Sequence, residues 1–386
     1  MTDSPAAGES LFDPVRPEAP LAETPLAETP LAAWHRAQGG RMVPFAGFLM
    51  PVQYRAGIMA EHLHCRAAAA LFDVSHMGQA ELVGDGAAAA LEQLCPSELR
   101  SLRPGRQRYG LLLNADGGIV DDLMVANLGD RLFVVVNASR KAVDLPLIES
   151  VLPAGVSLRA LPDRALLALQ GPGAVATVSA LAPGIAALGF MGVGRFELCG
   201  AEAIVSRSGY TGEDGVEISI PAEQAEALAD ALLARPGVMP AGLGARDSLR
   251  LEAGLCLYGQ DIDESTTPVE AGLMWSVGKR RRTDWDFRGA GPVRDQHENG
   301  CARRRVGLRP EGRQPARAET MIHHDGAAVG SITSGGFGPS AGAPVAMGYV
   351  HPDHAADNTP LDLVVRGRAL PARVSSLPFI PHRYAR

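Results

Sequence analysis

The sequence predicts an α+β protein with more than one domain, and three observations support this fold class. At 386 residues, the chain is too long for one ordinary hydrophobic core. Strand and helix patterns are mixed along it without the strict alternation of a parallel α/β sheet. After a basic stretch at 279–305, short strand patterns broken by Gly and Pro replace this mixture, which indicates a small β-barrel or sandwich. We therefore place a domain boundary near residues 285–300.

Composition narrows the class of protein further. Apolar residues make up 46% of the chain and charged residues 20%, which is typical of soluble globular proteins. A formal net charge of −7 argues against nucleic acid as the main partner. The five cysteines are scattered without a Cys-x-x-Cys pair, which indicates reduced thiols in a cytosol-like compartment. No apolar run is long enough to span a membrane, and the acidic, Arg-poor N-terminus resembles neither a secretory signal nor a mitochondrial transit peptide.

The first elements are predicted from local patterns. Residues 1–28 are expected to form a disordered tail, because their Pro- and Glu-rich repeat has little to bury. The run Leu132–Val136 is continuously apolar and predicts a strand buried on both faces. This strand is placed at 132–137. The periodicity also predicts helices at 58–71 and 87–94 and strands at 111–114 and 118–126.

Later elements follow in the same way. The alternation in Val216–Ile220 predicts a strand with Glu217 and Ser219 on the face opposite its apolar residues. Further strands are predicted at 165–170 and 203–206, a helix at 222–234, and C-terminal strands at 329–333, 345–350, 361–365 and 370–374.

The segment 208–252 holds one candidate binding site. A Gly-rich acidic turn leads into the strand that carries Glu217, and an amphipathic helix pattern leads to Arg246. A carboxylate on a rigid strand can accept two N–H donors of a flat, amidine-like group, and a nearby Arg can bind an acceptor. This pair suits a polar heterocycle. From these residues alone, a surface hairpin followed by a salt-bridged helix is the slightly favoured interpretation.

Asp121 and Asp122 form a second candidate site, after Gly117-Gly118 and among apolar residues. Neighbouring strand residues face opposite ways, so only one of the two carboxylates can join a given site. A poorly solvated carboxylate has a raised pKa and suits proton transfer or cation stabilisation. The residues alone leave this interpretation and a role in turn geometry equally open.

Other motifs are weaker indications of a functional site. His62-x-His64 and His351-x-x-His354 lack a matching second ligand pair, so no metal site is expected. The Gly-rich stretches fit no phosphate loop or dinucleotide fingerprint, so no nucleotide is expected. The basic runs 279–282 and 303–305 are interpreted as solvated linker faces, with a docking patch for an acidic partner protein as the alternative.

With these residues in view, the chain resembles the glycine cleavage T-protein family from about residue 29 to residue 384. The strings that carry the resemblance are Gly39–Gly47, Leu71–Met77, Gly117–Leu123, Leu167–Pro172, Gly209–Glu217, Ala245–Gly272, Ala346–Val350 and Pro378–Pro381. The resemblance implies a three-lobed, cloverleaf folate-binding fold. Its aminomethyltransferase body of two lobes would span 29–285, and a C-terminal β-barrel domain would span 300–386.

The resemblance also implies an activity. An aminomethyl group on the lipoyl arm of the H-protein is transferred to tetrahydrofolate, giving 5,10-methylenetetrahydrofolate, ammonia and dihydrolipoyl H-protein. The P- and L-proteins of the glycine cleavage system would be indirect partners. A cytoplasmic location in a bacterial host is expected, in preference to a mitochondrial matrix.

Site residues carry over from the matching motifs. Asp122 is similar to the family's essential carboxylate, Glu217 to its pterin-binding glutamate and Arg246 to a folate-site arginine. The positions that line the family's pocket correspond to Met77, Tyr109, Asn137, Tyr210, Tyr384 and Trp275. A preorganised Asp122 would stabilise the positive charge that develops on the one-carbon unit when its N–CH2–S linkage breaks.

Two other functions stay open at this point. A folate-linked demethylase, or the folate lobe of a sarcosine or dimethylglycine dehydrogenase, would need another small substrate or a flavin domain, and the sequence has no flavin fingerprint. A folate-binding module without catalysis would not need the set Asp122, Glu217 and Arg246.

Overall fold

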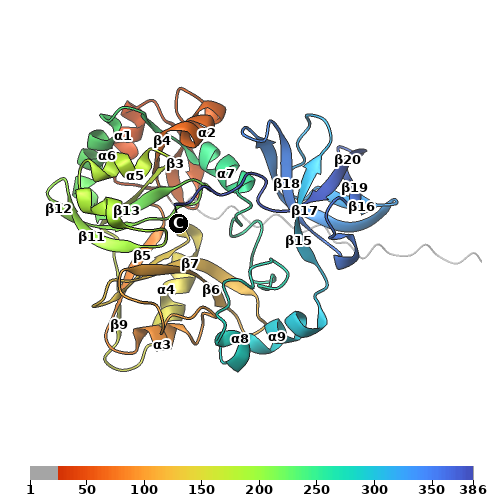
Figure 1. The fold of residues 1–386 in the computed structure, drawn as a ribbon, viewed down its shortest axis with the longest axis horizontal. Helices are drawn as coiled ribbons and strands as arrows, with labels where there is room; N and C mark the ends of the chain where they lie inside the picture. The colour runs from red at the N-terminus through yellow and green to blue at the C-terminus, as the bar shows by residue number, and fades with distance from the viewer. Residues whose placement is uncertain (1–24, 386) are drawn as a thin grey trace, which may run out of the picture.

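The computed structural model of this chain describes residues 25–385 and contains three lobes (Figure 1). A six-stranded sheet forms the core of the first lobe, a five-stranded sheet that of the second, and a closed six-stranded barrel forms the third. The C-terminal segment leaves the barrel and returns to the centre, between the first and second lobes (Figure 1). The predicted α+β class, the three lobes and the C-terminal barrel are confirmed.

In the first lobe, the strand order is β11-β12-β13-β10-β4-β14. The strands are β4 (Ala69–Asp73), β10 (Arg164–Gln170), β11 (Val193–Leu198), β12 (Ala201–Ser206), β13 (Gly215–Pro221) and β14 (Val238–Pro240). One face packs on α5 (Ala174–Ser179) and α6 (Ala225–Leu233), and the apolar residues of β13 lie in this core. The alternation of β13 therefore turns Glu217 to the other face, as predicted.

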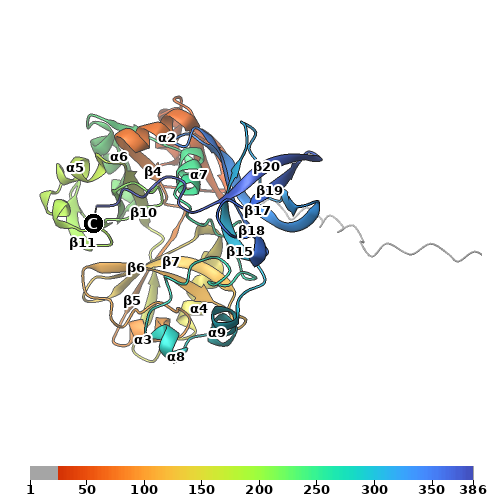
Figure 2. The ribbon, with the colours of Figure 1, turned by 45° about the vertical axis from the view of Figure 1, so that its right-hand side comes forward.

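The other face of this sheet is covered in part by α2 (Ile58–Ala67) and α7 (Leu243–Glu252), whose Cys65 and Leu249 pack on Phe72 and Ala168. In both views α7 lies between the first lobe and the barrel (Figure 1 and Figure 2). Its Arg250 donates a hydrogen bond to Ser334 of the barrel over 2.9 Å. Helix α7 therefore fixes the barrel against the first lobe.

In the second lobe, the strand order is β6-β7-β8-β5-β9. These strands are β5 (Gly78–Val83), β6 (Arg106–Leu113), β7 (Ile119–Asn127), β8 (Leu132–Val136) and β9 (Ser157–Ala160), and the helices are α3 (Ala87–Leu91) and α4 (Lys141–Glu149). Leu132, Val134 and Val136 pack into the lobe core. Phe133, on the opposite face of β8, packs against Ile204 of the first lobe. Strand β8 is thus buried on both faces, as its apolar run predicts.

A short hairpin and the barrel complete the molecule. The hairpin sheet has the order β1-β3-β2, with β1 (Ala27–Glu28), β2 (Arg41–Phe45) and β3 (Phe48–Gln53), and α1 (Ala32–Ala37) lies between its first two strands in sequence. The barrel strands are β15 (Arg304–Pro310), β16 (Met321–His324), β17 (Ala327–Gly338), β18 (Ala343–Val350), β19 (Pro360–Val365) and β20 (Arg368–Ser375). Helices α8 (Arg281–Asp284) and α9 (Ala290–Asn299) connect the body to the barrel, and the 3-10 turns are η1 (Ala138–Arg140), η2 (Pro183–Ala187), η3 (Ala222–Gln224) and η4 (Pro352–His354). None of the helices within residues 25–385 combines the length and apolar character that a membrane crossing requires.

Some sequence predictions were wrong in detail. The helix predicted at 58–71 ends at Ala67, and its last residues belong to β4, which pairs with β10 and β14. The strand predicted at 111–114 is only the end of β6. The predicted tail lies outside the described residues up to residue 24, and its last two residues form β1.

The basic runs are also less solvated than predicted. Arg281 is 2% exposed and donates to the carbonyl of Glu92, and Arg305 donates to the carbonyl of Ala271 over 2.8 Å. Both arginines hold the connection between the lobes, because buried carbonyls need donors and a guanidinium group supplies several.

Candidate functional site

The site begins on β7, where the strand alternation separates the two aspartates. Asp121 lies on the face of Leu123 and Val125, which belong to the core of the second lobe. Asp122 lies on the opposite face, with Met124, and this face is turned toward the first lobe. Only Asp122 can therefore contact a ligand held between the two lobes.

Asn137, which directly follows β8, connects the two carboxylates despite their opposite faces. Its Nδ2 donates to Asp122 Oδ1 over 2.7 Å and to Asp121 Oδ1 over 2.8 Å. Its backbone N–H donates to Asp121 Oδ2 over 3.0 Å. The two aspartates lie on opposite faces of β7, as the strand alternation predicts, but one amide side chain fixes the orientation of both.

The surroundings of Asp122 favour its protonated form. Burial and the charge of Asp121 raise the pKa of Asp122 to about 7, although hydrogen bonds with Tyr109 and Asn137 act in the opposite direction. A carboxyl group with this pKa takes up and releases protons near neutral pH. Asp122 can therefore serve as a proton acceptor or as a charge next to a developing cation.

Glu217 faces the same space from the first lobe. It pairs with Ser206 of β12 and Ala168 of β10, and its Oε2 accepts a hydrogen bond from Ser208 Oγ over 3.1 Å. A small cavity of about 10 Å³ lies between the two sheets, lined by Gln107, Met124, Ala126, Phe133, Val135, Leu166, Ile204, Ser206, Glu217 and Ser219. A cavity of this size has room for about one water molecule, and Glu217 is the carboxylate in its wall.

Arg246 approaches this region from α7. Its guanidinium carbon lies 4.6 Å from the centre of the Tyr210 ring, and the Tyr210 hydroxyl donates to the carbonyl of Cys256. Burial lowers the pKa of Arg246, and the charge of Glu217 acts in the opposite direction. Arg246 Nη1 is buried and has no hydrogen-bond partner among the described residues. A buried donor without an acceptor is costly in free energy, so this nitrogen is available to a ligand.

Aromatic residues lie next to Asp122. Tyr109, whose hydroxyl lies near Asp122, stacks on Trp275 with ring centres 5.3 Å apart, and Trp275 is 66% exposed. Tyr384 of the C-terminal segment stacks on Phe190 at 4.4 Å. Tyr109 and Trp275 therefore form an apolar wall next to Asp122.

The structure thus brings several predicted residues into direct contact. Asp122 contacts Asn137 and Tyr109, and Arg246 contacts Tyr210. Met77 packs against the core cluster that contains Leu166, one of the residues that line the cavity. Trp275 reaches the site through its ring partner Tyr109, whereas Tyr384 contacts the rings of Phe190 and His382, which are not among the predicted site residues.

Three polar residues of the site were missed by sequence reasoning. Ser208 donates a hydrogen bond to Glu217, and a Ser three residues before the Gly-rich turn that begins at Thr211 gave no specific signal. His76 has a buried Nδ1 without a partner among the described residues, and burial followed by Arg246 lowers its pKa to about 4. Asp144 lies near Asp121. His76 directly precedes Met77 in a matching string, so that string could have indicated it, whereas Asp144 lies outside every such string.

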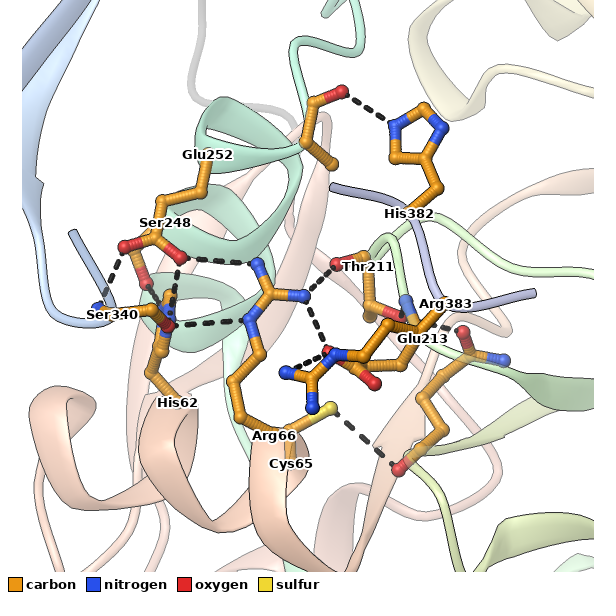
Figure 3. A network of polar contacts seen from close by, with 12 residues as sticks. His62, Cys65, Arg66, Thr211, Glu213, Ser248, Glu252, Ser340, His382 and Arg383 are labelled. Carbon is orange, nitrogen blue, oxygen red and sulfur yellow. Dashed lines mark hydrogen bonds and ion pairs between the residues drawn. The ribbon is translucent and has the colours of Figure 1, made fainter. Parts of the chain in front are cut away.

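Other titratable groups of the junction bind each other instead of facing a cavity. His62 contacts Ser248, Glu252 and Ser340, and Arg66 bridges Glu213 and Glu252 (Figure 3). Within the part of the chain that the structure describes, no three His, Cys, Asp or Glu residues are grouped as metal ligands. His62 and His64, one of the rejected metal pairs, have separate partners.

Comparison with known proteins gives consistent matches over the described lobes. The sequence model of the family described as "GCVT N-terminal domain" matches residues 31–281. The model described as "Glycine cleavage T-protein C-terminal barrel domain" matches residues 303–380.

Individual proteins are similar over nearly the whole chain. An aminomethyltransferase from Gallus gallus, named as mitochondrial, is 47% identical and covers 91% of this chain and 92% of its own. The protein of the same name from Homo sapiens is 46% identical, with 91% and 89% covered. A crystal structure of the glycine cleavage system aminomethyltransferase T from Bartonella henselae is 42% identical, with a TM-score of 0.90, over 94% of this chain and 100% of that one.

Proposed function

Because this chain belongs to the glycine cleavage T-protein family and is an aminomethyltransferase, we propose that its central site joins a lipoyl-bound aminomethyl group to tetrahydrofolate. Asp122 stands at the reacting carbon in this proposal, and Glu217 and Arg246 bind the pterin ring. Tyr210, Asn137, Met77, Tyr109, Tyr384 and Trp275 form the walls.

This proposal rests mainly on the state of one guanidinium nitrogen of Arg246. Arg246 Nη1 is buried without a partner among residues 25–385, and Glu217 is close enough for its charge to act on Arg246. A ligand that fits both must present an acceptor to the arginine and adjacent N–H donors to the carboxylate. The pterin ring of tetrahydrofolate has both on one edge, and paired N–H donors match a carboxylate in a planar, two-point contact.

The chemistry follows from the charges at the carbon. A folate nitrogen forms a bond to the one-carbon unit, the bonds of that carbon to nitrogen and sulfur break, and a second folate nitrogen closes the methylene bridge. The two folate N–H protons leave with ammonia and with the lipoyl thiol, so the atoms balance. Positive charge builds on the carbon in between, and ionised Asp122 stabilises it at a position that Asn137 fixes.

Loaded H-protein provides the test. We would supply lipoylated H-protein that carries an aminomethyl group, together with tetrahydrofolate, and follow ammonia release. Asp122→Asn is expected to bind tetrahydrofolate normally but to lose on the order of a hundredfold in turnover, because one preorganised charge is removed. Glu217→Ala should chiefly weaken folate binding. Glu223→Gln, which changes an exposed glutamate of the same lobe, is the matched control.

Each failure has a separate meaning. If the wild-type protein released ammonia at the same rate without H-protein, the loaded H-protein would be rejected as the substrate. Full turnover by Asp122→Asn would leave the family membership intact and remove Asp122 from the mechanism.

The partner and the compartment belong to the same proposal. The lipoylated H-protein is the direct partner, with the P- and L-proteins indirect. A cytoplasmic location is supported by the scattered free cysteines, although the named relatives are mitochondrial proteins. We keep 29–285 as the catalytic body and 300–386 as the barrel domain, which the limits of the matched family models support. Fractionation of the native host with an antibody against this chain tests the compartment.

A further inference from the structure

The C-terminal segment, residues 376–385, follows the barrel and ends at the centre of the molecule (Figure 1). It first binds the end of α7. The backbone N–H of Ile380 donates to the carbonyl of Glu252 over 3.0 Å, and His382 Nε2 donates to the carbonyl of Ala253 over 2.8 Å. The last carbonyls of a helix have no partner within the helix, so these two hydrogen bonds supply donors from outside it. The segment is therefore attached to the end of α7.

The next residue of the segment binds the Gly-rich turn that precedes β13. The backbone N–H of Arg383 donates to the carbonyl of Gly212 over 2.8 Å, and Arg383 and Glu213 form an isolated parallel β-bridge. The guanidinium group of Arg383 also pairs with Glu213, with 2.8 Å between Nη2 and Oε1 (Figure 3). The backbone and the side chain of one residue therefore hold the same turn.

The segment thus connects two elements that already meet in the proposed folate site. Tyr210 belongs to the turn, and the centre of its ring lies 4.6 Å from the guanidinium carbon of Arg246, which α7 carries. Residues 380–383 join the same turn to the same helix a second time. The placement of the Tyr210 ring against Arg246 therefore depends on where the segment holds the turn.

Arg383 can place the turn without being required for the fold. Its side chain is 51% exposed, whereas that of Glu213 is 1% exposed. Arg66 also binds Glu213 Oε1 over 2.8 Å, so this buried carboxylate keeps a counter-charge when Arg383 is replaced. The end of the segment has a separate attachment, because the Tyr384 ring stacks on Phe190 with ring centres 4.4 Å apart. Loss of the Arg383 side chain should therefore loosen the turn rather than detach the segment.

We propose that Arg383 is a positioning residue for tetrahydrofolate: by binding Gly212 and Glu213 it fixes the turn, so that Tyr210 keeps the Arg246 guanidinium group in place for the ligand. A site that is ordered before the ligand arrives binds more tightly, because less ordering has to occur on binding. The inference rests on the proposed function, since it assigns a task to the residue that holds the turn of Tyr210. Arg383 itself is assigned no contact with the folate.

Two substitutions separate this role from general stability. Arg383→Met keeps an unbranched side chain and the backbone N–H but removes the charge, so the turn is held less firmly. The dissociation constant of tetrahydrofolate is expected to rise about fivefold or more. Turnover at saturating folate should change by less than about twofold, because Asp122 lies in the second lobe. Arg383→Lys keeps a positive charge next to Glu213, and its dissociation constant should stay within about twofold of the wild-type value.

The measurements are calorimetric titration with tetrahydrofolate, ammonia release from loaded H-protein, and thermal unfolding of the full chain. Arg294→Met, at an exposed arginine that pairs with Glu298, is the matched control and should bind folate normally. An unchanged folate affinity in Arg383→Met would overturn the proposal, and so would an equal loss of affinity in Arg383→Lys. A loss of turnover at saturating folate as large as the loss of affinity would also overturn it, since Arg383 would then act on the transfer step.

Hydrogen–deuterium exchange gives a readout that needs no folate. In the free protein, the amides of residues 209–215 should exchange faster in Arg383→Met than in the wild type and in Arg383→Lys, while the amides of β8 should not change. Equal exchange of the turn in Arg383→Met and the wild type would overturn the inference. Failure of the proposed function is distinct, because the wild type would then bind no tetrahydrofolate, and the exchange comparison would still decide whether Arg383 holds the turn.

Discussion

At the scale of single residues, Arg246 combines a structural cost with the binding function that we propose for it. Its buried guanidinium nitrogen, which has no partner within the described chain, lowers the stability of the free protein. Evolution can keep such a group where a ligand satisfies it, since stability is commonly given up at functional sites. The arginine one helical turn further along α7, Arg250, is fully paired with Asp247 and Asp261 and serves the fold instead.

Arg246→Gln should therefore weaken tetrahydrofolate binding while leaving the fold intact. A hydrogen bond from a charged donor contributes about 1.5–3 kcal/mol, so the dissociation constant is expected to rise roughly 10- to 150-fold. Calorimetric titration measures this. Arg282→Gln, at an exposed arginine, is the control and should bind normally. An unchanged affinity in Arg246→Gln would show that the free nitrogen does not face the ligand.

The pKa of Asp122 near 7 predicts a pH dependence at the same scale. Turnover should rise with pH through about 7, because the ionised carboxylate stabilises the cation. The free energy of unfolding should instead fall as the pH rises. The pKa of an unfolded Asp is about 3.9, so the wild type loses stability as pH rises from there through 7. The thermal unfolding temperature of Asp122→Asn should thus exceed that of the wild type by a few degrees at pH 8 and differ little at pH 4. A difference in unfolding temperature between Asp122→Asn and the wild type that does not change with pH would contradict the raised pKa of Asp122.

At the scale of elements, sequence patterns predicted those strands and helices whose burial follows their own periodicity. The apolar run of β8 and the alternation of β13 are examples. The Ala-rich end of the helix predicted at 58–71 failed, because residues 69–71 pair with β10 and β14 from far along the chain. Tertiary pairing of this kind overrides local propensity.

The candidate site shows the same limit. Local patterns singled out Asp121, Asp122, Glu217 and Arg246 as chemically unusual, but only the family resemblance joined residues of different lobes into one site. The hydrogen bonds from Asn137 to Asp121 and Asp122 join residues of separate elements and leave no periodic signal in the sequence. Sequence reasoning could therefore propose the groups but not their connections.

The turn that precedes β7 gives a prediction at this scale. A Cβ atom on Gly118 would lie 1.8 Å from the carbonyl oxygen of Glu264, which is backbone and cannot rotate away. Gly118→Ala should cost about 1–3 kcal/mol in the free energy of unfolding and lower turnover by shifting Asp122. Chemical denaturation and the ammonia assay would measure both. Gly291→Ala in α9, where a Cβ meets nothing within 4 Å, should be neutral or slightly stabilising.

At the scale of the whole molecule, one buried ionic network connects the first lobe to the barrel and to the C-terminal segment (Figure 3). Arg66 of α2 binds Glu213 over 2.8 Å and Glu252 of α7 over 3.0 Å, and Glu252 also accepts from the backbone of Ser340 in the barrel. Arg383 of the C-terminal segment binds Glu213 at 2.8 Å. The relative placement of the lobes therefore depends on charges as well as on apolar contacts.

Arg66→Met should destabilise the protein by about 3–5 kcal/mol, because it leaves buried carboxylates without their main counter-charge. Chemical denaturation of the full chain measures the loss. The exposed pair of Arg294 and Glu298 offers a control, and Arg294→Met should change stability by less than about 1 kcal/mol. A loss in Arg66→Met no larger than in the control would show that the network adds nothing to the assembly of the lobes.

The exposed indole of Trp275 gives the molecule a built-in optical reporter. Trp34 is buried in the first lobe and Trp285 packs on Phe287, whereas Trp275 combines a solvent-facing ring with a stack on Tyr109 beside Asp122. A folate that binds against Tyr109 would exclude water from this indole and shift its fluorescence emission to shorter wavelengths. Trp275→Phe should abolish this spectral change, while the fluorescence of Trp34 and Trp285 remains. Folate binding could therefore be followed by intrinsic fluorescence without any label.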